Sequence, residues 1–262
     1  MEITYIANDG FLIQAFNRKI LIDALFGNFE SDWCAVPSRE IIEKMETSTR
    51  PFDQIDLILI SHSHVDHFNP EIVIKHLEDN EAGILICPEQ VRMELEKDKR
   101  YENLSTRVKE ITPEFNTGDQ AINIKGMCIK VWRLKHSAYY LESETTKKRY
   151  NKHKNVQNLG FTIEIEHKRI FHGGDWAYDG RGRKTNPLKK EKIDVAFLGG
   201  GAYLRLFGPA STAINEYKKP ENIVLMHIPP NINIEELPEE EKKAISMATV
   251  FKSPMEIKHF GS

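Results

Sequence analysis

The sequence predicts a mixed α/β fold with more strands than a simple doubly wound sheet would have. Short continuous apolar runs at 57–60 and 84–87 each lead into a segment with helical character, which is typical of βαβ-like units on a sheet. From residue 107 onward the pattern is mostly that of strands, and residues 161–166 alternate strictly between apolar and polar side chains. The 262 residues, 40% of them hydrophobic, are enough to bury a full core in one large domain or two small ones.

The N-terminal stretch is expected to form short strands joined by tight turns. Three strands are predicted at residues 3–6, 11–16 and 19–23. The residue types at 8–10 and 17–18, Asn-Asp-Gly and Asn-Arg, favour the turns between them. A short helix is expected from Ser38, because isoleucines at 41 and 42 and a methionine at 45 follow at helical spacing.

The middle of the chain alternates between strands and helices. The apolar run 57–60 is expected to be a strand buried on both faces, and it leads directly into a polar segment. Asn69 supplies a helix cap and Pro70 a first-turn residue, so a helix should follow as far as about residue 79. The strand at 84–87 then leads to a charged helix that begins near Pro88.

The remaining elements are mostly strands. Residues 107–134 have a strand-like pattern, and the strict alternation at 161–166 predicts a strand with one face in solvent. Further strands are expected at 169–172, 195–198 and 223–226, and glycines follow the first two of them. Helices are expected near 209–217 and 238–248.

The composition excludes several classes of protein and indicates a compartment. No apolar run approaches the roughly 20 residues that a membrane helix needs, and no signal peptide is visible at the start. The three cysteines are an odd number and far apart, which argues against a disulfide framework and a cysteine zinc site and fits a reducing compartment. We therefore expect a cytoplasmic protein. The net charge of −3 gives no indication of a nucleic-acid partner.

The strongest functional signal is the motif His62-x-His64-x-Asp66-His67, which follows the buried strand at 57–60. Imidazole and carboxylate groups are the usual ligands of zinc-like cations where cysteine is absent. The spacing of His62 and His64 lets an extended loop aim both rings the same way, while Asp66 and His67 can face a second ion beside the first. Three histidines and an aspartate within six residues favour a metal site over a solvated polar loop, because the whole chain has ten histidines.

One loop supplies too few ligands for two ions, and further donors follow other predicted strands. His136, Asp175 and His227 each come directly after such a strand, and two glycines before the aspartate allow the backbone to approach an ion closely. Alone, each residue has an ordinary interpretation, since a lone histidine is more often a surface or core residue. Together they share the end of a strand, which is where the active site of an α/β sheet lies.

These motifs resemble those of the metallo-β-lactamase-fold hydrolase superfamily. The resemblance covers nearly the whole chain and lies in five separate motifs in family order, namely Asp23, His62-x-His64-x-Asp66-His67, His136, Gly173-Gly174-Asp175 and His227. The stretches 4–13 and 198–203 are similar to the branch that contains ascorbate-6-phosphate lactonase and N-acyl-phosphatidylethanolamine phospholipase D. The resemblance implies a single hydrolase domain over residues 1–262, built as a four-layer αββα sandwich with two metal ions at one edge.

The resemblance also implies a role for each of these residues. The two ions would be held by His62, His64 and His136 and by Asp66, His67 and His227, respectively. Asp175 would bridge the ions, so that Asp66 and Asp175 are the expected catalytic residues, and Asp23 would orient a ligand. A histidine at position 64 disfavours the oxygen-reducing di-iron branch, in which that position is typically glutamate. Zinc is the expected metal, with manganese or iron as the next choices.

The expected chemistry is hydrolysis by a metal-activated hydroxide. Two adjacent ions can share a water and lower its pKa towards neutrality, and the hydroxide would attack an ester, lactone or phosphodiester centre. The proton donor to the leaving group stays open among four residues in predicted loops near the ligands: Tyr139, Tyr140, His153 and Tyr203. His172 is expected to support the site or the core and not to bind an ion directly.

A local basic excess suggests that the substrate is an anionic small molecule, such as a phosphorylated one. Between residues 142 and 192 the chain has 13 Lys and Arg against 7 Asp and Glu. Two basic loops, 147–154 and 181–184, follow His136 and Asp175 and should overhang the metal site. Two solvated loops with no role in recognition are an equally weighted interpretation.

Two other functions stay open from the sequence. A nuclease could share the metal motif, although the negative net charge, the short chain and the lack of an obvious RNA-binding appendage oppose it. A metal-loaded sensor without turnover is the second alternative, and a ligand set that looks complete and leaves the bridging position for water opposes it. The sequence does not indicate an oligomeric state, and a homo-oligomer is compatible with it.

Overall fold

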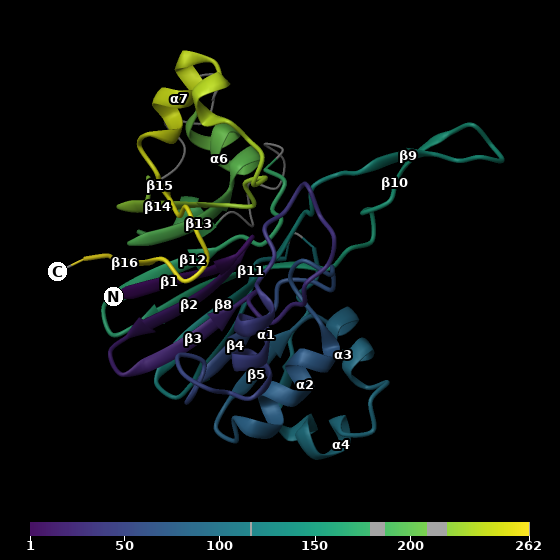
Figure 1. Ribbon diagram of the computed structural model, residues 1–262, viewed down its shortest axis with the longest axis vertical. Coiled ribbons are helices and arrows are strands. Elements are labelled where there is room, and N and C mark those ends of the chain that lie inside the picture. Colours follow the sequence, from purple (N-terminus) through teal and green to yellow (C-terminus); the bar gives the residue numbers. More distant parts are fainter. Residues whose placement is uncertain (116, 179–186, 209–218, 262) are drawn as a thin grey trace.

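A computed structural model describes residues 1–115, 117–178, 187–208 and 219–261, and two mixed β-sheets of seven strands each face one another in it (Figure 1). A small two-stranded ribbon projects from this body. The first sheet comes mainly from the N-terminal half of the chain and the second sheet from the C-terminal half. Strand β16 is the exception, because it returns from the C-terminal end to pair with β1.

The first sheet has the strand order β16-β1-β2-β3-β4-β5-β6. Its strands are β1 (Glu2–Ala7), β2 (Gly10–Ala15), β3 (Arg18–Ile22), β4 (Leu57–Leu59), β5 (Ile84–Cys87), β6 (Val108–Glu110) and β16 (Ile257–His259). Strands β1 to β3 are antiparallel neighbours, whereas β3 to β6 run parallel. As a result β1, β3 and β4 point the same way, and the segments that follow them meet at one edge.

The second sheet has the order β15-β14-β13-β12-β11-β8-β7. Its strands are β7 (Asp119–Ile124), β8 (Met127–Leu134), β11 (Asn158–Ile165), β12 (Lys168–His172), β13 (Val195–Gly199), β14 (Asn222–Met226) and β15 (Thr249–Val250). Strands β12 to β15 are parallel, and β8 runs in the same direction because antiparallel β11 separates it from β12. The segments after β8, β12, β13 and β14 therefore also share one edge.

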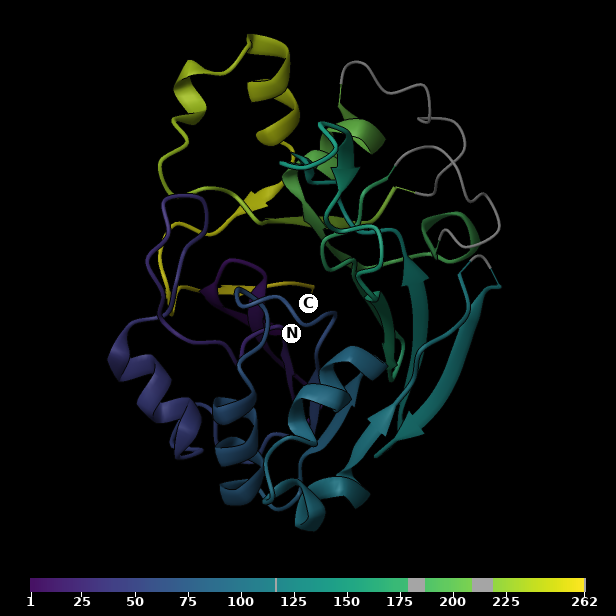
Figure 2. The same cartoon turned by 90° about the vertical axis from the view of Figure 1, so that its right-hand side faces the viewer.

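Helices cover the outer faces of both sheets, and this confirms the predicted four-layer αββα sandwich. The first sheet is covered by α1 (Arg39–Glu46), α2 (Pro70–Asp79) and α3 (Glu89–Leu95), with the short α4 (Tyr101–Leu104) and a 3₁₀ turn (Ser105–Arg107) nearby. The second sheet is covered by α5 (Pro187–Lys190), α6 (Gly200–Phe207) and α7 (Glu239–Ile245). Figure 2 shows the early helices (purple to blue) and the late helices (yellow) on opposite sides of the sheets.

Three apolar clusters correspond to the three interfaces between these layers. The central cluster contains buried side chains of both sheets, among them Phe11, Ile22, Phe161 and Phe197. Since both sheets contribute to the same core, their strand ends are held in a fixed relation to each other. Burial of such side chains contributes about 25 cal/mol per Å² of apolar surface, which makes this shared core the main stabilising feature of the site's scaffold.

Local sequence signals set the bounds of the first helices as expected. Ser38 Oγ accepts a hydrogen bond from the Ile41 amide at 3.3 Å, and Asn69 Oδ1 accepts one from the Ile72 amide at 3.2 Å. Both caps pair an amide that has no partner within its helix. Pro70 then occupies the first turn of α2, where its missing N–H costs nothing.

The expectation of a solvent-exposed face on residues 161–166 holds only toward its end, where Glu164 is half-buried and Glu166, just past β11, is exposed. Within β11, Thr162 is buried, and its Oγ1 accepts a hydrogen bond from the indole of Trp132 at 3.0 Å. The outer face of this sheet is covered by the α5–α7 layer, so alternation in the sequence did not mean exposure to water. The helix expected near 209–217 lies outside the described residues, and the glycine-rich helix α6 was not expected.

The ribbon that projects from the body is formed by β9 (Tyr140–Glu142) and β10 (Arg149–Asn151) and is called the arm here (residues 137–157; Figure 1). It leaves the body after His136 and returns to β11. Among the helices that the structure describes, none is long and apolar enough to cross a membrane.

Candidate metal centre

The shared edge of the two sheets gathers histidine and aspartate side chains from six chain segments. These side chains form two groups of possible metal ligands, and within each group the donor atoms all lie within 4.8 Å of one another. The first donor group is His62, His64, His136 and Asp175, and the second donor group is Asp9, His67, Asp175 and His227. Asp66 contacts two members of the second group. All seven predicted metal residues therefore come together, and Asp9 joins them.

Nitrogen atoms dominate the first donor group. His62 Nε2 lies 3.0 Å from His64 Nδ1 and 3.3 Å from His136 Nε2. Asp175 Oδ2 lies 3.2 Å from His136 Nε2 and 4.0 Å from His62 Nε2. A tetrahedral zinc ion with bonds of about 2.0–2.1 Å has donors about 3.3 Å apart, so this spacing fits one.

The hydrogen bonds around the first group fix which ring nitrogens carry protons. Ser61 Oγ lies 2.6 Å from Asp23 Oδ2 and donates its only proton there, so at 2.9 Å it must accept one from His62 Nδ1. His136 Nδ1 lies 2.7 Å from the carbonyl of Ser137 and must donate to it. In the neutral rings both Nε2 atoms therefore present lone pairs to each other, an arrangement that a shared cation stabilises.

Carboxylates dominate the second donor group. His67 Nε2 lies 3.3 Å from Asp9 Oδ2, 3.4 Å from Asp66 Oδ2 and 3.3 Å from Asp175 Oδ1. His227 Nε2 lies 3.6 Å from the same oxygens of Asp66 and Asp175. Asp175 thus turns Oδ2 to the first donor group and Oδ1 to the second.

Asp9 is the member of the site that the sequence analysis missed. It was assigned to the turn between β1 and β2, and turn residues are ordinarily exposed. Here Asp9 is fully buried, because β1 runs parallel to β3 and its turn reaches the same edge as Asp23. The neighbouring Asn8 donates from Nδ2 to Asp66 Oδ2 at 2.9 Å. The direction of the predicted hairpin is the feature of the sequence that could have indicated that Asp9 lies at this edge.

Asp23 lies behind the donors and can orient His67, as the resemblance implied. Its Oδ2 accepts from His67 Nδ1 at 2.9 Å, which leaves Nε2 directed at the second donor group. Its Oδ1 accepts from the Ser61 amide at 2.7 Å. Asp23 therefore connects the start of the histidine loop to the ring of its last histidine.

Gly174 positions Asp175 for a reason different from the predicted approach to an ion. Its φ is +52°, and a Cβ there would lie 2.7 Å from Ser61 Cβ and 2.5 Å from Asn158 Oδ1. Asn158 Oδ1 in turn accepts from the Asp175 amide at 3.1 Å. His172 has the expected supporting role, since its Nε2 donates to the Asp9 carbonyl at 3.0 Å and its Nδ1 accepts from the Gly174 amide at 3.2 Å.

The two donor groups differ in their protonation. Burial, together with the neighbouring imidazoles, lowers the pKa of His62 well below its usual value and that of His64 to about 4. Burial would also lower the pKa values of His67 and His227, but the surrounding carboxylates outweigh it. They raise the pKa of His67 well above its usual value and that of His227 to about 10. Burial raises the pKa of Asp9 to about 8.

Two further observations indicate that these donor atoms suit divalent cations. His67 Nε2, Asp175 Oδ1 and Asp9 Oδ1 are buried and make no hydrogen bond. Buried polar atoms normally have a partner, and the partner that suits nitrogen lone pairs and carboxylates together is a metal ion. The raised pKa values of His67 and His227 also show that the carboxylates require positive charge there.

Two cavities open onto Asp175 and His227. A cavity of about 640 Å³ is lined by Tyr139, Lys152 and His153 of the arm, and the ring of His153 lies 4.7 Å from that of His64. A second cavity of about 420 Å³ is lined by Lys135, Tyr140 and Arg205, among others. Only the root of the arm is therefore at the site, and the second basic loop, 181–184, lies outside the described residues.

The four candidates for the proton donor differ in whether they reach the two cavities. Tyr139, Tyr140 and His153 line the two cavities, whereas Tyr203 is fully buried in α6, outside both. The Tyr203 hydroxyl donates to the Ala244 carbonyl at 2.5 Å, and burial raises its pKa. Tyr203 therefore has neither the position nor a free proton for the reaction.

Comparisons with known proteins agree with this geometry. Residues 18–228 match the family model described as beta-lactamase superfamily domain. A UPF0173 metal-dependent hydrolase of Staphylococcus aureus strain MRSA252 is 24% identical over 251 residues, which cover 95% of each chain. Among solved structures, the metallo hydrolase Igni18 of Ignicoccus hospitalis has a TM-score of 0.58 at 17% identity, with 99% of each chain covered. The metallo-beta-lactamase fold protein YhfI of Bacillus subtilis has a TM-score of 0.60 at 15% identity, with 98% of each chain covered.

Proposed function

The chain belongs to the beta-lactamase superfamily and is a metal-dependent hydrolase, and from this premise we propose that it uses two divalent ions to cleave an ester, lactone or phosphodiester bond in an anionic small molecule. One observation carries the proposal. Asp175 belongs to both donor groups, with one carboxylate oxygen directed at each. A carboxylate in that position would hold both ions and would leave room for a water between them.

The ions supply a Lewis acid and a bound water whose pKa is lowered towards neutrality. The chain's own residues arrange this chemistry. Asp175 sets the separation of the two donor groups, and Asp66, held by the Asn8 amide at 2.9 Å, adds negative charge to the second. Asp23 keeps the His67 ring turned so that Nε2 faces the site. Asp66 and Asp175 are thus the proposed catalytic residues beside the histidines.

The proposed ligand sets are those that the two donor groups define. His62, His64 and His136 would bind one ion, and His67, His227 and Asp66 the other, with Asp175 between them. Asp9 would be an additional donor to the second ion. Zinc is the proposed metal because imidazole and carboxylate sites of this spacing suit it, and manganese or iron would be the alternatives.

Basic side chains around the two cavities support an anionic substrate. Lys152 lines the cavity beside the arm, and Lys135 and Arg205 line the other, so each of the two cavities that reach Asp175 has a basic side chain in its wall. The tip of the arm, with Lys147 and Lys148, points away from the body (Figure 1). Recognition of charge is therefore assigned to the root of the arm and to α6 and not to the tip.

The finer identity of the enzyme is also a proposal. The similarity of residues 4–13 and 198–203 to the lactonase and phospholipase branch supports an ester, lactone or phosphodiester as the bond. The three free cysteines support a reducing, cytoplasmic location. A single domain over residues 1–262 is supported by the core that both sheets share.

The test is a substrate panel with metal control. Protein stripped with a chelator and reloaded with zinc is assayed with bis-p-nitrophenyl phosphate, a panel of esters and lactones, and RNA. We expect hydrolysis of small esters, lactones or phosphodiesters only in the reloaded protein, and none in Asp175→Asn. Cleavage confined to RNA would indicate the nuclease alternative. Two bound ions without turnover of any substrate would indicate the sensor.

A further inference from the structure

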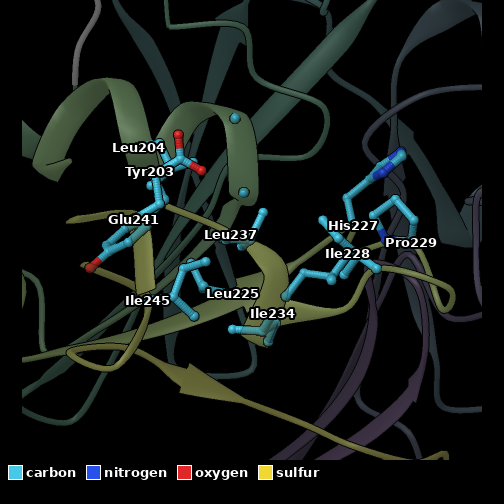
Figure 3. Close-up of a pocket in the computed structure, with 13 residues that line it drawn as sticks. Tyr203, Leu204, Leu225, His227, Ile228, Pro229, Ile234, Leu237, Glu241 and Ile245 are labelled. Atoms are coloured by element: carbon cyan, nitrogen blue, oxygen red, sulfur yellow. The ribbon is translucent and has the colours of Figure 1, made fainter. Parts of the chain in front are cut away.

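A small apolar cavity is lined at one end by His227, a member of the second donor group (Figure 3). We propose that it binds an apolar group of the substrate, such as a phenyl ring or a short alkyl chain, and that Gly200 and Gly201 keep it accessible. This inference rests on the proposed hydrolase function, because it places the scissile bond at the donor groups. It adds the chemical class of the neighbouring substituent.

The walls of the cavity come from three segments of the C-terminal layer. They are the first turns of α6, the segment that follows β14 and includes a 3₁₀ turn (Ile234–Glu236), and helix α7. Apolar side chains that line it include Leu204, Leu225, Ile228, Ile234, Leu237 and Ile245. Figure 3 shows His227 and Glu241 at opposite ends of this group of side chains. One end of the cavity is therefore a proposed metal ligand.

The chemistry of the walls favours an uncharged apolar ligand. Tyr203 also lines the cavity, but its hydroxyl donates its only proton to the Ala244 carbonyl and has none left to donate to a ligand. Among the lining residues only His227 and Glu241 carry ionisable groups besides that phenol. A charged substituent would lose its hydration without gaining partners, whereas an apolar one would be removed from water.

The volume limits the size of that substituent. The cavity measures about 200 Å³. A dry cavity of about 150 Å³ lined by similar side chains can hold benzene, so a phenyl ring or a chain of about six carbons is the expected upper size. A long lipid chain would not fit within it.

Two glycines connect this cavity to the cavity above Asp175. Gly200 and Gly201 line both, and His227 lines both as well. In the described part of the chain, a Cβ at either glycine would meet no atom within 4 Å, and neither glycine has a positive φ. Packing and backbone geometry therefore do not require glycine there.

Helix formation does not require glycine at these positions either. Both residues are the first two of α6, and alanine, the better helix former, would be tolerated there. What the two glycines provide is open space on a path from Asp175 to the apolar cavity. A substrate with its reacting group at the donor groups can extend its apolar substituent over them.

The first test measures binding without turnover. Calorimetry on the zinc-loaded protein compares phenylphosphonate and hexylphosphonate with methylphosphonate. We expect the phenyl and hexyl compounds to bind at least about tenfold more tightly than methylphosphonate, and Gly201→Leu to abolish this ratio by filling the path. Gly201→Ala should reduce the ratio by about threefold while its Tm equals or exceeds that of the wild type, because alanine is the better helix former.

The outcomes separate this inference from the proposed function. Equal affinities for the three phosphonates, or no binding, would overturn the apolar subsite whether or not esters are hydrolysed. A ratio that persists in both glycine variants would overturn it too. A strong preference for the phenyl compound that Gly201→Leu removes, in protein that hydrolyses nothing, would support the subsite and contradict the proposed function.

Discussion

The two donor groups share Asp175 but differ in composition and charge. The first is three imidazoles and one carboxylate, and the pKa values of His62 and His64 are lowered, so it is ready to bind a cation at neutral pH. The second surrounds His67 and His227 with carboxylates that raise the pKa values of both, so protons occupy it when no metal does. If the two donor groups bind one ion each, as proposed, the difference predicts unequal affinity and unequal dependence on pH for the two ions.

Removal of the shared carboxylate should have the largest effect. Asp175→Ala takes one donor from each group, and we expect kcat/KM to fall by about 10³-fold or more and the zinc content to fall below two per chain. Asp119→Asn, an exposed carboxylate on β7, is the matched control and should change neither quantity. If Asp175→Ala kept both ions and its activity, the groups would not be joined through this residue.

Asp66 and Asp9 allow a sharper comparison within the second donor group. Asp66 lies within 3.6 Å of Nε2 of both His67 and His227, whereas the contact of Asp9 is with His67. We expect Asp66→Asn to lower the affinity for the second ion by about 100-fold and Asp9→Asn to lower it by about tenfold. The affinity for the first ion should not change in either variant. Zinc titration against a competing chelator measures this order, and the reverse order would make Asp9 the principal ligand.

Loss of the Asp23 carboxylate, which orients His67, should lower mainly the metal affinity of the second donor group. Asp23→Asn weakens the acceptor for His67 Nδ1, and such supporting contacts typically change metal affinity by about 10–100-fold. The Ser61 amide and hydroxyl can still bond to the new side chain, so the fold should persist. Circular dichroism provides the check on folding. An equal loss of both ions would mean that Asp23 acts on the loop as a whole and not on His67.

The smallest expected effect is a difference in pH dependence between the two ions. At pH 7 the metal-free first group carries no proton on His62 or His64, since their pKa values lie below 7, so these two ligands release none on binding and its affinity should depend on pH less steeply than that of the second group. The second group must release protons from His67 and His227, whose pKa values lie above 7, so its affinity should rise with pH by up to about tenfold per unit for each proton. Calorimetry in buffers of different ionisation enthalpy measures the protons released.

The sequence predicted the first donor group better than the second for a physical reason. His62 and His64 are neighbours in one loop, and His136 and Asp175 follow strands whose apolar runs are recognisable. The second group depends on the turn at Asp9, whose burial follows from the direction of a hairpin across the sheet and from its contact with the second sheet. The predicted strands could have given the direction of the hairpin, but no local pattern contains the contact with the second sheet.

The fold shows the same division between local and tertiary information. Caps and apolar runs predicted the start of α1 and both bounds of α2 and β5 to within a residue or two. The buried face of β11 was missed because the helices that cover it come from later in the chain. Helix α6 was missed because its glycines disfavour a helix locally, and its apolar side chains pack on the second sheet and α7.

The most direct test of two ions joined by Asp175 is anomalous diffraction at the zinc edge from crystals of zinc-loaded protein. The account predicts two peaks, one beside His62, His64 and His136 and the other beside His67 and His227, with a carboxylate oxygen of Asp175 on each. A single peak, or two peaks with Asp175 on only one of them, would contradict it.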